Sequence, residues 1–165
     1  MTAFVLRDAV RADVPHVRRL VRGLAEYERL LDKVVATEAD FEHLLFGAPP
    51  RCHAVLAECA DGRVPGIAIF YYTINTFAGR TGLFLEDLFV EQDCRGAGIG
   101  RALLRHLAQR ALAEDCNIIE WRVLNWNAPS IAFYERLGAT PMRDWHVRQL
   151  GGAALKALAE GASNG

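Results

Sequence analysis

The stretch LFLEDLFVEQDCRGAGIGRALLRHLAQRA, residues 83–111, decides the fold of this chain. It opens on an apolar run from Leu83 to Val90, interrupted by Glu86 and Asp87, which is typical of a buried strand. Apolar residues then recur at helical spacing from residue 99 to the end of the stretch, which predicts an amphipathic helix. The stretch therefore predicts a strand, a turn and a helix in that order.

The turn between this strand and this helix is rich in glycine: Gly96, Gly98 and Gly100 stand within CRGAGIGR, residues 94–101. Such a turn leaves backbone N–H groups free at a helix N-terminus, where they and the helix dipole favour an anion such as a phosphate. Glycine also lets the backbone approach that anion without a side chain in between. The sequence predicts a phosphate-binding turn, although an ordinary, tightly packed strand–helix turn can show the same short pattern.

Two common phosphate motifs are excluded. A dinucleotide fingerprint G-x-G-x-x-G that begins at Gly96 requires glycine at the position of Arg101, and it requires a second half of the fold for which too little chain remains. A P-loop requires Gly-Lys-Ser/Thr after its spacer, and the chain has no such run. What remains is R-x-x-G-x-G, Arg95 to Gly100, between a strand and a helix.

Length and composition predict one domain over residues 1–165, because 52% apolar residues can build a sizeable core. The net charge of −1 gives no indication of a nucleic acid or an acidic membrane as partner. No apolar run approaches the roughly 20 residues of a membrane span, and the N-terminus lacks the apolar core of a signal peptide. We therefore expect a cytoplasmic protein that binds neither nucleic acid nor membrane.

The cysteines and histidines predict no metal site. Cys52, Cys59, Cys94 and Cys116 show no C-x-x-C spacing, and the five histidines are scattered. We expect reduced thiols. Cys94 stands beside Arg95 near a helix start, where its pKa could be lowered, but we treat this position as incidental.

Periodicity and turn signals predict the remaining elements. Strands are predicted at residues 4–7, 53–59, 66–74, 117–124 and 145–150, with helices at 14–28, 130–137 and 153–159 and a short helix that Thr37 caps and Gly47 ends. Residues 75–82 are predicted as a polar loop. Short connections make the three central strands antiparallel, and a helical crossover makes residues 83–90 parallel to the next strand. The fold class is therefore α/β (α+β), a mixed central sheet with helices on both faces.

The segment NWNAPSIAFYERLGA, residues 125–139, resembles the W-N-x-P-S-x-x-F-Y-x-x-x-G-A block of the Gcn5-related N-acetyltransferases (GNAT). R-x-x-G-x-G at residues 95–100 resembles the coenzyme A pyrophosphate loop of the same superfamily. Together with LED at residues 85–87 and AEYE at residues 25–28, these motifs make the chain similar to the diamine and thialysine N-acetyltransferases, the branch that includes spermidine/spermine acetyltransferase. The resemblance extends from Phe4 to about Leu150. It implies the GNAT fold with splayed strands at the acetyl-CoA site, and a homodimer.

The resemblance also implies how acetyl-CoA, the cosubstrate, is held. Backbone N–H groups of Leu88 and Val90 would bind the acetyl carbonyl and the pantetheine, and the glycine turn would bind the pyrophosphate. The expected set is Leu88, Phe89, Val90, Arg95, Gly96, Ala97, Gly98, Ile99, Gly100, Arg101, Asn127, Pro129, Ser130 and Tyr134.

Acetyl transfer from a thioester to an amine requires a base for the amine, donors that polarise the carbonyl, and an acid for the leaving thiolate. The resemblance assigns the base, acting through water, to Glu86 and the acid to Tyr134. A carboxylate in so apolar a strand is costly unless it is paired or useful. Glu86 and Asp87 are expected on opposite faces of a regular strand. Without its flanking motif, Tyr134 would more readily be a core aromatic with a satisfied hydroxyl.

Carboxylates at the expected amine site predict a cationic substrate. By resemblance, the amine-binding residues are Tyr27, Glu28, Glu86, Asp87, Asn75, Phe77, Glu120, Trp121, Arg122 and Trp145. Glu28 alone could equally be a solvated helix end. The polyamine enzymes carry an acidic residue and a tryptophan where this chain has Asn75 and Phe77. This difference favours a small amine or a lysine-like amino acid.

Two functions stay open. The first is acetyl-CoA-dependent transfer of an acetyl group to a primary amine of a diamine, a polyamine or a lysine-like amino acid such as thialysine. The alternative is a CoA-binding protein without turnover that acts through protein contacts. The presence of Glu86, Asn127 and Tyr134 favours the enzyme.

Overall fold

The structure, a computed structural model, describes residues 3–161 and divides the chain into two compact units between Arg122 and Val123. The first unit holds a β-sheet and three α-helices, and the second holds two short α-helices. The prediction of a single domain over residues 1–165 stays a prediction.

The sheet of the first unit has five strands in the order β1-β2-β3-β4-β5. The strands are β1 (Phe4–Asp8), β2 (His53–Cys59), β3 (Gly66–Asn75), β4 (Arg80–Val90) and β5 (Ile119–Trp121). β1 to β4 are antiparallel neighbours, whereas β5 pairs with β4 in parallel. The predicted mixed sheet is confirmed.

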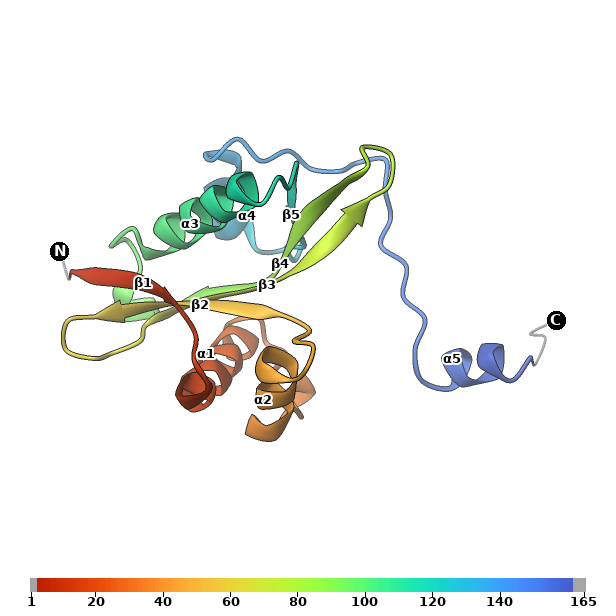
Figure 1. Cartoon of the computed structure of the whole chain (residues 1–165), viewed down its shortest axis with the longest axis horizontal. Coiled ribbons are helices and arrows are strands. Elements are labelled where there is room, and N and C mark those ends of the chain that lie inside the picture. Colours follow the sequence, from red (N-terminus) through yellow and green to blue (C-terminus); the bar gives the residue numbers. More distant parts are fainter. Residues whose placement is uncertain (1–2, 162–165) are drawn as a thin grey trace. The chain divides into compact units, whose positions relative to one another are not determined.

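Helices cover both faces of this sheet (Figure 1). α1 (Val14–Tyr27) and α2 (Glu38–Phe46) lie on one face, where Val17 and Leu20 of α1 are buried in a core with Ile67 and Ile69 of β3. α3 (Ile99–Ala113) lies on the other face. Single helical turns are η1 (Arg11–Asp13), η2 (Leu31–Lys33) and η3 (Gln92–Cys94). Within residues 3–161, no helix is long and apolar enough to cross a membrane.

Two strand predictions next to the β3–β4 turn were too short. β3 extends to Asn75 and β4 begins at Arg80, and these two residues pair with each other. The predicted loop 75–82 is therefore a tight hairpin turn, in which the Asn75 side-chain oxygen accepts a hydrogen bond from the Ala78 N–H at 3.1 Å. The apolar pattern missed these strand ends because their side chains are largely exposed to solvent.

Two further strand predictions fail in the second half of the chain. The strand expected at 117–124 is reduced to β5, and the strand expected at 145–150 is not formed. The described part of the second unit contains α4 (Ala128–Glu135), α5 (Gly152–Ala159) and no strand. A strand needs a neighbour for its backbone hydrogen bonds, and the apolar alternation around Trp145, whose side chain is 70% exposed, has no such neighbour within this unit.

The start of β3 packs closely against the start of α3. A Cβ atom at Gly66 would lie 2.7 Å from Cγ2 of Ile99 and 3.3 Å from Cβ of Ala57. Ile99 is the first residue of α3 and is buried. This close approach fixes the helix start that carries the glycine turn.

We predict that Gly66→Ala lowers the free energy of unfolding by about 1–2 kcal/mol, because the added methyl group overpacks a filled core. Urea denaturation measures the change. Gly151→Ala is the matched control, since Gly151 has an extended backbone and open space around its would-be Cβ; we expect a change within about 0.5 kcal/mol. A Gly66→Ala protein as stable as the wild type would contradict the close packing.

Candidate active site

β4 contains a bulge at Glu86. In the pairing with β3, Phe70 faces Leu85 and Ile69 faces Asp87, so Glu86 is an extra residue without a partner in β3. The extra residue shifts the alternation of β4 by one position. The side chains after Glu86 therefore point to the opposite faces of the sheet from those they would take in a regular strand.

Asp87 lies on the face that α1 and α2 cover. Phe89 belongs to the core of that face together with Ile69. Asp87 stands opposite Ile69 and two residues before Phe89, so its side chain takes the same direction.

The side chain of Glu86 lies on the same face, as the alternation of the residues before the bulge indicates. It stands two residues after Phe84, whose ring stacks on Tyr71 with 5.2 Å between the ring centroids. Tyr71 in turn stands two residues after Ile69 in β3. The expectation that Glu86 and Asp87 point to opposite faces is wrong, because it assumed a regular strand.

Two carboxylates, those of Glu86 and Glu28, act on the carboxylate of Asp87. Burial, then the neighbouring Glu86 and Glu28, raise the pKa of Asp87 from 3.8 to about 6. Burial also raises the pKa of Glu28. Among the described residues, no hydrogen bond or ion pair reaches the side-chain carboxylate of Asp87 or of Glu28. Carboxylates gathered in this way attract a cation.

The end of β4 offers backbone N–H groups on one side. The Glu91 N–H donates to the Pro65 carbonyl at 2.9 Å, so the N–H groups of Leu88 and Val90 point away from β3. The pairing of β4 with β5 ends at Leu85. Within the described chain, these two N–H groups therefore face a side of β4 that carries no paired strand.

The glycine turn follows this strand end. Gly96 and Gly98 have φ angles of 80° and 86°, which other residues rarely adopt, and Gly98 is the N-cap of α3. The Arg95 Nε donates to the Val90 carbonyl at 3.0 Å. The Arg95 guanidinium lies 4.4 Å from the ring centroid of Tyr27, at the end of α1. Arg95, the arginine of the R-x-x-G-x-G motif, thus connects the turn, β4 and α1.

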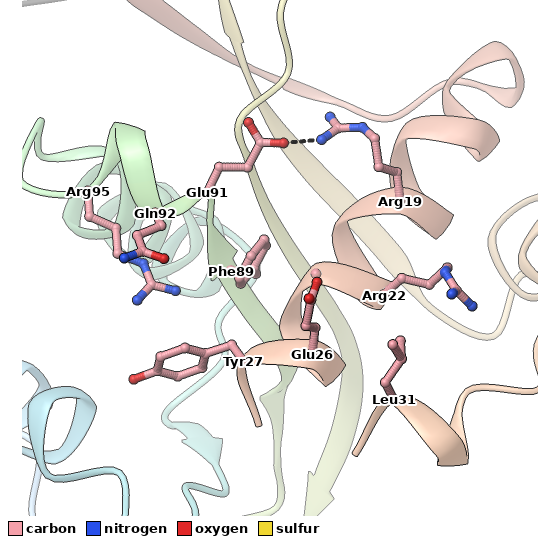
Figure 2. Close-up of a pocket in the computed structure, with 10 residues that line it drawn as sticks. Arg19, Arg22, Glu26, Tyr27, Leu31, Phe89, Glu91, Gln92 and Arg95 are labelled. Atoms are coloured by element: carbon pink, nitrogen blue, oxygen red, sulfur yellow. Dashed lines mark hydrogen bonds and ion pairs between the residues drawn. The ribbon is translucent and has the colours of Figure 1, made fainter. Parts of the chain in front are cut away.

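A cavity of about 490 Å³ lies between α1, the end of β4 and η3 (Figure 2). Its lining residues are Arg19, Arg22, Gly23, Glu26, Tyr27, Leu31, Phe89, Glu91, Gln92 and Arg95. Tyr27, Phe89 and Arg95 are residues that the sequence predicted, whereas the others were missed. Arg19, Arg22 and Glu26 follow one another at helical spacing of three and four, a signal that could have identified this face of α1. Glu86 and Asp87 are not among the lining residues.

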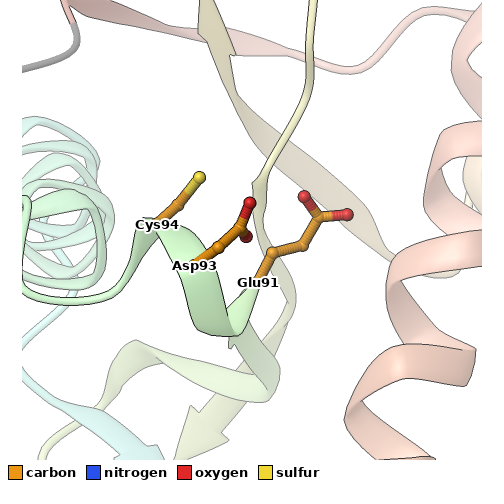
Figure 3. A group of neighbouring side chains, drawn as sticks. All are labelled: Glu91, Asp93 and Cys94. Atoms are coloured by element: carbon orange, nitrogen blue, oxygen red, sulfur yellow. The ribbon is translucent and has the colours of Figure 1, made fainter.

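Glu91, Asp93 and Cys94 form a second cluster, with ligand atoms within 4.8 Å of one another (Figure 3). Arginines already pair with both carboxylates: Arg19 and Arg63 with Glu91, and Arg63 with Asp93 at 2.8 Å. Burial raises the pKa of the Cys94 thiol, so the lowered pKa considered from the sequence is wrong. This cluster is an ion-pair network on the surface.

The predicted site residues of the second unit gather on α4, apart from Trp145. The buried Asn127 is the N-cap, and its side-chain oxygen accepts a hydrogen bond from the Ser130 N–H at 3.3 Å. Pro129 stands in the first turn and Tyr134 near the end of the helix, with its ring centroid 5.4 Å from that of Phe133.

The remaining predicted residues lie at two places in the sheet. Asn75 and Phe77 belong to the β3–β4 turn, where Phe77 is 98% exposed, and the structure does not bring them to the cavity. Glu120 and Trp121 lie in β5 opposite Phe84 and Leu85. β5 therefore runs beside the bulge region.

Residues 19–139 match the Acetyltransferase (GNAT) family. Thialysine N-epsilon-acetyltransferase of Bos taurus is 34% identical over 96% of this chain and 99% of its own length. Spermidine/spermine N(1)-acetyltransferase-like protein 1 of Homo sapiens is 35% identical over 89% of this chain and 22% of its own length.

An integron cassette protein from the mobile metagenome of V. cholerae has a similar fold, with a TM-score of 0.81 and 23% identity over 97% of this chain and 99% of that one. The family match, together with the mixed five-stranded sheet, confirms the predicted GNAT fold, and the sequence matches confirm the predicted branch. The chain belongs to the GNAT family of N-acetyltransferases.

Proposed function

We propose that the protein, as a homodimer, transfers the acetyl group of acetyl-CoA to a primary amine of a diamine, a polyamine or a lysine-like amino acid such as thialysine. The observation that carries this proposal is the gathering of Glu28, Glu86 and Asp87 on one face beside the open side of β4. A cationic amine is the ligand that such a group favours. The thialysine enzyme of Bos taurus, to which the chain is similar over nearly its whole length, is named for a substrate of this kind.

The residues around the end of β4 fit acetyl-CoA. The N–H groups of Leu88 and Val90 would hold the acetyl carbonyl and the pantetheine, and the backbone around Gly96 and Gly98 would hold the pyrophosphate. Acetyl-CoA, when bound, supplies the acetyl group as a thioester. The fit is supported by open space at both glycines, where a Cβ would meet no atom within 4 Å.

The chain's own residues would move the protons. Glu86 accepts the amine proton through a water molecule. Asp87 beside it attracts the substrate in its cationic ammonium form, before that proton is lost. Tyr134 donates its hydroxyl proton to the leaving sulfur. Asn127 positions the pantetheine or a water molecule at the start of α4. The alternative, a CoA-binding protein without turnover, predicts cofactor binding but no thiol release with any amine.

We predict that Gly98→Asp weakens binding of CoA by about 100-fold or more, because the added carboxylate meets the pyrophosphate and the backbone needs a positive φ. Isothermal calorimetry measures the affinity, and circular dichroism checks that the fold persists. Gly62→Asp is the matched control, since Gly62 also has a positive φ with open space around it. Unchanged affinity for CoA in Gly98→Asp would remove this placement, and NAD should bind to none of the three proteins.

We predict that Asp87→Asn raises the free energy of unfolding at pH 7 by about 1–3 kcal/mol. The folded-state pKa of Asp87, about 6, lies above the ordinary value of 3.8, so its contribution to stability is complete below pH 4 and is lost as the pH rises through 6. The advantage of Asp87→Asn should therefore grow between pH 4 and pH 7 in urea denaturation.

Asp93→Asn serves as the control of opposite sign. The Arg63 guanidinium lowers the pKa of Asp93, so this change should cost stability at pH 7 and less at low pH. An Asp87→Asn protein less stable than the wild type at pH 7 would show that the ionised carboxylate is stabilised by its surroundings.

We predict that Tyr134→Phe lowers kcat by about 10²–10⁴-fold with KM nearly unchanged, because a general acid acts in the transition state far more than in the bound ground state. Glu86→Gln should lower kcat and also weaken binding of the cationic amine. Its deficit should shrink at high pH, where free amine is plentiful, whereas that of Tyr134→Phe should not. Turnover of Tyr134→Phe within a few-fold of the wild type would assign thiolate protonation to another group or to water.

A further inference from the structure

Arg122 directly follows β5, and its side chain reaches across to the bulge of β4. Its guanidinium lies 5.2 Å from the ring centroid of Phe84, and its Nη2 lies 3.4 Å from Oε2 of Glu86. The side chains of Arg122 and Glu86 are 54% and 45% exposed. A cation therefore stands beside the carboxylate that we propose as the base.

The contact between Arg122 and Glu86 is weak enough to be exchanged. A single long contact between two half-exposed side chains contributes little to stability, because solvent screens it. The stacking of Arg122 on Phe84 is a separate, favourable contact that does not involve Glu86. Arg122 can therefore release Glu86 and still be held at the edge of the site by Phe84.

The charges on this face differ for two kinds of substrate. An ammonium group that binds to Glu86 takes the place of the guanidinium, which then has no anion of its own. With a diamine, the second ammonium adds one more cation near Arg122, and like charges at close range repel each other. With an amino acid, the α-ammonium comes together with a carboxylate that the released guanidinium can bind.

We infer that Arg122 is a specificity-determining residue, which binds the carboxylate of the substrate and so favours amino acids with a side-chain amine over diamines of the same length. The planar fork of an arginine side chain suits this task, because it binds both oxygens of a carboxylate at once. The inference rests on the proposed function, since it requires that the amine is acetylated beside Glu86.

The test compares L-lysine with two amines. One is 1,5-diaminopentane, which differs from lysine by the carboxylate alone, and the other is L-lysinamide, in which an uncharged amide replaces the carboxylate. We expect the wild type to have the highest kcat/KM for lysine. Arg122→Met should lower the ratio of kcat/KM for lysine to that for 1,5-diaminopentane by about 10-fold or more, the range of a charge-assisted hydrogen bond. The loss should lie in KM for lysine, and Arg122→Lys should restore part of it.

Arg80→Met is the matched control, because Arg80 pairs with Asp115 at the other end of β4, and it should leave the ratio unchanged. If Arg122→Met also leaves the ratio unchanged while amines are acetylated, or if the wild type prefers the diamine, the inference is overturned and the proposed function stands. If the wild type releases no thiol with any of these amines, the proposed function itself fails. Thermal unfolding of each variant separates these outcomes from misfolding.

Discussion

The bulge at Glu86 changes two alternations of β4 at once: the face to which side chains point and the side to which N–H groups point. With the bulge, Glu86 and Asp87 share the face of α1 and α2, and the Leu88 N–H turns toward the side where the pairing with β5 has ended. In a regular strand, one of the two carboxylates would point to the opposite face of the sheet, the face of the buried Leu85. A single unpaired position thus brings acidic side chains and free backbone donors to the same stretch of strand.

This arrangement has an electrostatic cost that the structure does not remove. Asp87 is half-buried beside Glu86 and Glu28, and its pKa is raised by burial first and then by these two neighbours, because each disfavours its ionised form. Arg122 lies near enough to contact Glu86 but is too exposed to neutralise the group. A site that keeps unpaired carboxylates at the edge of a core is typical of binding and catalysis, because nothing in the packing of the sheet requires them.

The strand–turn–helix unit was predictable because each part has its own local signal: an apolar run, glycines at positive φ, and helical periodicity. The bulge was not predictable. A strand pattern of period two assumes that every residue has a partner in the next strand, and the extra residue has no recognisable signal in the sequence. The failed strand at 145–150 has the opposite cause. Its apolar alternation is real, but a strand depends on a neighbour that no local pattern can specify. The lining residues of α1 were missed because Arg19, Arg22 and Glu26 look like an ordinary solvated helix face.

Arg95 shows how the parts of the first unit depend on one another. Its Nε binds the carbonyl of Val90, whose N–H points to the open side of β4, and its guanidinium stacks on Tyr27, the residue before Glu28. α1 also approaches β4 closely, because a Cβ at Gly23 would lie 2.8 Å from the Phe89 ring. The glycine turn, the N–H groups of β4 and the carboxylate at the end of α1 are therefore tied together through one side chain. The arginine that begins R-x-x-G-x-G thus has a role in the structure that is separate from any contact with a phosphate.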